Sequence, residues 1–65
     1  MQTSEKITRD DLRSMQSGET RTWQLPNAYA VDSARTTASQ LTALEGVKYT
    51  VSSNYAERQI TITKG

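Results

Sequence analysis

Asp10 and Asp11 are the only adjacent carboxylates in this 65-residue chain and its nearest approach to a catalytic pair. Neighbouring positions on a helix point about 100° apart, so the two groups do not converge on one substrate atom. Both fall in the first turn of a predicted helix, where the helix dipole stabilises negative charge. Structural capping explains them better than catalysis does, and we predict no catalytic residue.

The chain contains no cysteine and no histidine, so its serines have no imidazole to activate them. Disulfides, thiolate nucleophiles and zinc sites built on these residues are excluded. The three glycines form no phosphate-binding, dinucleotide-binding or nucleophile-elbow pattern. We therefore expect no enzyme activity, no cofactor and no metal.

The basic residues point to binding instead. The net charge is only +1, well below that of a strongly basic nucleic-acid binder. A small sheet can nevertheless enter a major groove, with cations neutralising phosphates first and reading bases second. The predicted DNA or RNA site consists of Lys48, Arg58, Arg35, Arg21 and Lys64. Each of these residues also fits a solvated surface side chain.

A short helix is predicted over residues 9–16, ahead of a first strand over residues 19–25. Thr8 and Asp11 have the spacing of a capping box at the start of the helix. The strand alternates polar and apolar residues, and Trp23, its largest side chain, is expected to anchor the core.

A long helix is predicted over about residues 28–45. Its N-cap is either Asn27 or Asp32, and Gly46 is well placed to end it. Its apolar stripe at helical spacing consists of Val31, Ala34, Ala38, Leu41 and Leu44.

Two further strands are predicted over residues 47–52 and 57–64, joined by a loop over 53–56. Both alternate, and the register that places every apolar side chain on one face puts Tyr49 opposite Ile60.

These elements predict a single small α+β domain over residues 1–65, with residues 1–6 frayed. The expected order is α-β-α-β-β: a three-stranded mixed sheet, a long helix packed on one face and a short N-terminal helix. The uncovered face is either a solvated surface or a binding surface. It is expected to carry Thr20, Thr22, Gln24, Lys48, Thr50, Ser52, Gln59, Thr61 and Thr63.

Protein–protein association is the alternative function, because a small chain with a marginal core gains stability from a partner. The strand order is open. If the last strand lies at an edge, its uncharged segment Ile60–Thr63 can pair with a second copy; if that strand is central, this pairing fails. Tyr29 and Tyr55 are the predicted interface residues, although both also fit as caps of the core. No apolar run reaches the length of a signal peptide core or a membrane span, so we expect no membrane partner and a cytoplasmic location.

Several runs carry a resemblance over about residues 7–64: Ser17-Gly18-Glu19, Ser33-Ala34-Arg35, Gly46 to Val51 and Ile60 to Lys64. Their spacing and residue classes resemble those of small uncharacterised α/β proteins encoded in phages, prophages and mobile elements of gut bacteria. The resemblance implies a non-enzymatic accessory or regulatory protein, of a kind in which some members are suspected of binding DNA. It carries no functional motif over to particular residues.

Overall fold

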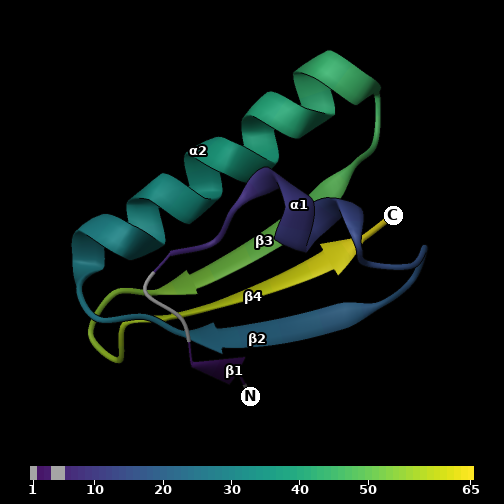
Figure 1. The fold of residues 1–65 in the computed structure, drawn as a ribbon. Helices are drawn as coiled ribbons and strands as arrows, with labels where there is room; N and C mark the ends of the chain where they lie inside the picture. Colours follow the sequence, from purple (N-terminus) through teal and green to yellow (C-terminus); the bar gives the residue numbers. More distant parts are fainter. Residues whose placement is uncertain (1, 4–5) are drawn as a thin grey trace.

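A four-stranded sheet of order β1-β2-β4-β3 carries two helices on one face (Figure 1). The computed structural model describes residues 2–3 and 6–65 of the chain, with side chains from residue 6 onward. The strands and helices in chain order are β1 (Gln2–Thr3), α1 (Arg9–Arg13), β2 (Thr20–Gln24), α2 (Ala28–Glu45), β3 (Tyr49–Asn54) and β4 (Gln59–Lys64).

The predicted α+β class is confirmed, but the predicted three-stranded mixed sheet is not. The three predicted strands form an antiparallel sheet, because β4 lies between β2 and β3 and runs antiparallel to both. The predicted order also omits β1, which pairs in parallel with β2 and places Gln2 opposite Trp23. Residues 2 and 3 therefore differ from the frayed N-terminus that we predicted. Residues 1, 4 and 5 of that segment lie outside the described residues.

The capping box of α1 forms as predicted. Thr8 Oγ1 accepts a hydrogen bond from the Asp11 backbone N–H at 3.3 Å, and the Asp11 carboxylate accepts one from the Thr8 N–H at 2.9 Å. The helix ends at Arg13, three residues earlier than predicted. Its C-cap is Ser14, and the chain then turns through Gly18 at a positive φ of 84°.

Two polar contacts hold α1 beside α2. Arg9 Nη2 donates to Gln40 Oε1 at 3.0 Å, and Arg13 Nη2 lies 2.8 Å from Glu45 Oε2. Because both pairs join exposed side chains, packing of the apolar side of α1 must contribute most of its attachment.

The long helix α2 has its predicted bounds. Asn27, not Asp32, is the N-cap: its Oδ1 accepts from the Ala30 N–H at 2.9 Å. Gly46 ends the helix in the left-handed conformation. One residue of the predicted stripe is wrong, because Leu44 is 67% exposed. Residues three positions apart on a helix point about 60° apart. Two such steps separate Leu44 from Ala38, so Leu44 points away from the covered face.

The pairing of β3 with β4 differs from the prediction by four residues. Tyr49 lies opposite Lys64 rather than Ile60. Because the slip is an even number, every side chain keeps its predicted face.

The register differs because the turn between the two strands lies two residues further along the chain than the predicted loop. The chain reverses over residues 55–58, where Asn54 Oδ1 accepts from the Glu57 N–H at 3.1 Å and Arg58 takes a positive φ of 55°. A side-chain-assisted turn of this kind extends β3 to Asn54, two residues beyond the predicted end.

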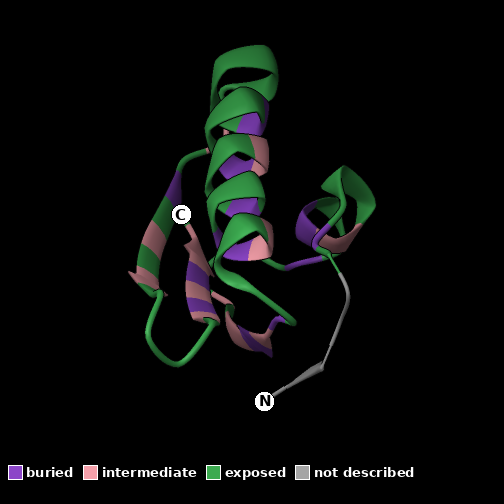
Figure 2. Cartoon of the chain, turned by 90° about the vertical axis from the view of Figure 1, so that its left-hand side faces the viewer, coloured by how far each residue is buried: buried purple, intermediate pink, exposed green. Residues whose placement is uncertain are grey.

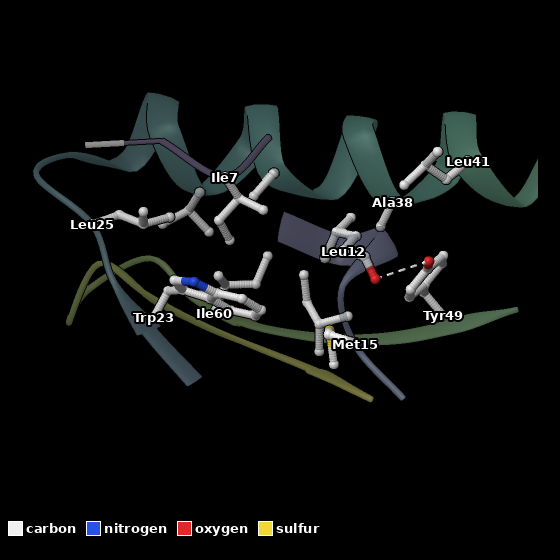
Figure 3. Close-up of a cluster of buried hydrophobic side chains, with 12 residues drawn as sticks. Ile7, Leu12, Met15, Trp23, Leu25, Ala38, Leu41, Tyr49 and Ile60 are labelled. Carbon is white, nitrogen blue, oxygen red and sulfur yellow. Dashed lines mark hydrogen bonds between the residues drawn. The ribbon is translucent and has the colours of Figure 1, made fainter. Parts of the chain in front are cut away.

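The core fills the space between the helices and the sheet (Figures 2 and 3). Trp23 is 1% exposed at its centre, as predicted, and the small side chains of Ala34 and Ala38 let α2 lie close to the strands. The core residues are Ile7, Leu12, Met15, Trp23, Leu25, Val31, Ala34, Ala38, Leu41, Tyr49, Ile60 and Ile62. No helix in the described part of the chain is long and apolar enough to cross a membrane.

Candidate interaction surface

The face of the sheet opposite the helices, here called the open face, carries three rows of uncharged polar side chains. Cross-strand hydrogen bonds join the β2 and β4 members: the two threonine pairs at 2.8 and 3.0 Å and the glutamine pair at 3.0 Å. This is the polar face that the alternation predicted, except that the longer β3 adds Asn54 and the predicted member Lys48 lies just before the strand. The rows, in the order β2, β4, β3, are Thr20-Thr63-Thr50, Thr22-Thr61-Ser52 and Gln24-Gln59-Asn54.

Two of the predicted nucleic-acid contacts lie on the other side of the sheet. Arg21 forms an ion pair with Glu19, and its Nη1 donates to Ser14 Oγ at 3.3 Å. Lys64 Nζ donates to the Met15 carbonyl at 2.8 Å. Both cations thus tie the sheet to the segment that follows α1 and do not reach the open face.

The third predicted cation, Arg35, belongs to a cluster on the outside of α2. Arg35 Nη1 donates to the Tyr55 hydroxyl at 2.9 Å, and this bond raises the pKa of Arg35 above its ordinary value. The same hydroxyl lies 3.5 Å from Asp32 Oδ1. Tyr29, 87% exposed, stands three positions before Asp32 and therefore shares its side of the helix. We call these four residues the tyrosine–arginine cluster.

The remaining two predicted cations, Lys48 and Arg58, are exposed at opposite ends of the β3–β4 hairpin. Lys48 precedes β3, and its carbonyl accepts from the Gly65 N–H at 2.7 Å. Arg58 is the last residue of the turn before β4. The structure therefore does not gather the five predicted cations at one site. Arg21 and Lys64 lie on the helix side of the sheet beside the segment after α1, Arg35 lies on α2, and Lys48 and Arg58 are separated by the length of the hairpin.

The outer edge of β3 offers backbone groups for binding. The bond from the Gly65 N–H to the Lys48 carbonyl marks these residues as a hydrogen-bonded pair. Such pairs alternate along an antiparallel ladder, so Thr50, Ser52 and Asn54 also bond to β4. The N–H and C=O groups of the residues between them, Tyr49, Val51 and Ser53, consequently point outward. In Figure 2 no described element lies beyond this edge.

Of the two alternatives left open for Ile60–Thr63, the structure excludes the edge position, because β4 lies between β2 and β3 and pairs on both sides. Val51 and Ser53 were not among the predicted binding residues, because the sequence left the strand order open. The sequence did contain one indication that this segment could bind another strand, because Tyr49–Asn54 has no charged residue and no proline. Local pattern, however, does not show which strand of a hairpin receives a third strand.

Two observations bear on catalytic or metal chemistry. Among the described residues, no group of three or more acidic side chains could hold a metal ion. No buried side-chain nitrogen or oxygen in the same part of the chain lacks a hydrogen-bond partner.

In comparisons with known proteins, no family model, no curated protein and no solved structure matches this chain. The resemblance to proteins of phages and mobile elements stays a prediction.

Proposed function

We propose that this chain is a non-enzymatic interaction module that binds an extended segment of protein along the outer edge of β3. The observation that supports this function is the open, uncharged edge itself. Its six residues present the outward backbone groups of Tyr49, Val51 and Ser53 to solvent. An added strand would satisfy these groups and continue the sheet.

Edge strands in monomeric proteins are usually protected against such pairing. Charged side chains, proline, bulges and very short strands are the common devices. In β3 the register with β4 is unbroken from Tyr49 to Asn54, with no charge and no proline. The opposite edge of the sheet is covered in part, because β1 pairs with the end of β2. The two edges are therefore unequal, and β3 is the better binding edge.

Side chains around the edge supply specificity. On the open face, Thr50 and Ser52 can hydrogen-bond to alternate residues of an added strand. Beyond the end of β3, the tyrosine–arginine cluster places Tyr55 and Arg35 within 2.9 Å of each other, with Tyr29 exposed nearby. Tyrosine and arginine are enriched among residues that dominate binding energy at protein interfaces. The cluster would anchor one end of the bound segment.

The nucleic-acid hypothesis remains a second proposal. A neutral hydrogen-bonding sheet face with Lys48 and Arg58 near its two ends supports it. Affinity for nucleic acid depends mainly on cations that converge on phosphates. With three of the five predicted cations directed elsewhere, the geometry favours a protein partner.

The test is a selection of random displayed peptides against the purified chain, followed by amide exchange in the presence of a selected peptide. We expect enrichment of uncharged, β-prone peptides that slow exchange at Tyr49, Val51 and Ser53. Ser53→Pro removes an outward N–H without breaking a bond to β4, so it should abolish binding.

The matched control is Thr20→Pro, which places a proline at the first residue of β2, away from β3, and should therefore leave peptide binding intact. Peptides that bind wild type and Ser53→Pro equally, or that protect residues away from β3, would overturn the proposed function.

A further inference from the structure

We propose that the segment added to β3 is β3 of a second copy, so that the chain forms a homodimer with one continuous eight-stranded sheet. This inference rests on the proposed function and names its partner. The dimer would have twofold symmetry, as most homodimers do, with the axis passing beside Val51.

The outward backbone groups are self-complementary in this arrangement. They come from Tyr49, Val51 and Ser53, which are spaced symmetrically about Val51. Two antiparallel copies therefore place Val51 opposite itself and Tyr49 opposite Ser53 of the second copy. All three are hydrogen-bonded pairs, each exchanging two N–H···O bonds. No outward group of these residues is left without a partner.

The open face matches as well. The same register places Thr50 opposite Ser52 of the second copy, so the row Thr20-Thr63-Thr50 continues across the interface into hydroxyl side chains. Lys48 falls opposite Asn54 rather than opposite a second lysine. Because like charges directly opposite destabilise a sheet, their absence favours this pairing.

Apolar burial favours the pairing on the covered face. Val51 is half-buried and packs against the core, and in the dimer it would meet the Val51 of the second copy. The flank of α2 above this edge contains Arg35, which reaches down to Tyr55. Ser39 and Thr42, four and seven positions later, share that flank, and their short side chains leave room for the second α2.

The size of the chain gives a further argument. A 65-residue domain without disulfides buries a smaller fraction of its surface on folding than a larger domain does, and is correspondingly marginal as a monomer. Pairing that buries Val51 and adds a full edge of hydrogen bonds would stabilise it by mass action.

Light scattering and amide exchange of the intact chain over a concentration series test the dimer. At high concentration we expect a mass twice 7.3 kDa, falling towards 7.3 kDa on dilution. Amides of Tyr49, Val51 and Ser53 should be protected only in the dimer. Thr50 and Ser52 bond to β4 and should be protected in both states, which makes them an internal control.

Val51→Lys supplies the second arm, because it places two positive charges beside the symmetry axis. We expect a monomer with the circular dichroism spectrum of the folded chain. Thr20→Lys adds the same charge at the far side of the sheet and should leave the dimer intact.

The outcomes separate the two proposals. A monomer at every concentration, whose β3 amides become protected only by a selected peptide, overturns the homodimer and supports the interaction module. A dimer in which Tyr49, Val51 and Ser53 exchange freely overturns the homodimer through β3. Free exchange of these amides both alone and with every selected peptide overturns both.

Discussion

The Tyr49 hydroxyl donates a hydrogen bond of 3.3 Å to the backbone carbonyl of Leu12 (Figure 3). This buried contact joins β3 to α1, which are far apart in the sequence. Leu12 is fully buried and Tyr49 is 9% exposed, so water does not readily replace the bond. The contact therefore contributes to holding the short helix α1 against the rest of the core.

Tyr49→Phe should lower the free energy of unfolding by about 1 kcal/mol, because the Leu12 carbonyl loses its partner in a buried site. Urea denaturation followed by Trp23 fluorescence measures the change. Tyr29→Phe is the matched control, since its side chain is 87% exposed and should cost nothing. Equal stability of the two variants would show that the Tyr49 bond is not stabilising.

Alkaline pH should weaken this same region. Burial, and next the nearby Glu45 carboxylate, raise the pKa of Tyr49 above its ordinary value. A raised pKa favours the neutral phenol in the folded state, so its stabilisation is complete below about pH 10 and is lost as pH rises through the folded value. Phenolate absorbance should contain a late-titrating part that Tyr49→Phe removes. A titration curve of unchanged shape in that variant would contradict the assignment.

At acidic pH, Glu19 should control stability. The Gln16 backbone N–H donates to its carboxylate at 2.9 Å, and this bond, followed by the Arg21 contact, lowers the pKa of Glu19. A lowered pKa means that the stabilisation is present above about pH 4.3 and is lost as pH falls through the folded value. Glu19→Gln should be less stable than wild type at neutral pH, and the difference should shrink in acid. A difference independent of pH would refute this role.

Substitution of two leucines on α2 should change the free energy of unfolding by very different amounts. Leu41→Ala should cost about 2–5 kcal/mol, because it leaves a cavity in the core. Leu44→Ala should change stability by less than about 0.5 kcal/mol, since Leu44 is 67% exposed while Leu41 is fully buried. Thermal or urea unfolding compares them, and similar losses for both would mean that Leu44 is packed.

Arg58 should be replaceable by glycine at the end of the β3–β4 turn. Its φ of 55° lies in the left-handed region, which costs a residue with a side chain about 1 kcal/mol relative to glycine. Arg58→Gly should therefore be more stable than Arg58→Ala, which loses the same charge but keeps the unfavourable conformation. The reverse order would show that the turn conformation carries no strain.

Titration into random-sequence DNA and RNA tests the nucleic-acid proposal. If it is correct, affinity falls steeply between about 50 mM and 200 mM salt, and Lys48→Ala and Arg58→Ala weaken binding. Arg21→Ala should have little effect, because Arg21 lies on the helix side of the sheet and bonds to Glu19 and Ser14. Absence of binding at low salt would leave the protein-binding function as the better proposal.

Much of the local structure could be predicted from neighbouring residues alone. The capping box at Thr8 and Asp11, the bounds of α2 and its end at Gly46 depend on contacts within a few positions, which sequence spacing reports directly. The two faces of each strand follow from alternation. Even the wrong register of β3 against β4 preserved them, because a slip of four residues keeps every side chain on its side of the sheet.

Only the tertiary structure decided which strand is central and which edge is open. The position of β4 between β2 and β3 depends on contacts between segments that are far apart in the chain. The alternation of polar and apolar residues in either hairpin strand is compatible with an edge position and with an inner position. That choice moved the candidate binding edge from Ile60–Thr63 to Tyr49–Asn54. Alternation with Trp23 and Ile62 already placed Arg21 and Lys64 on the helix side of the sheet, and the tertiary structure decided that the segment after α1 provides their partners.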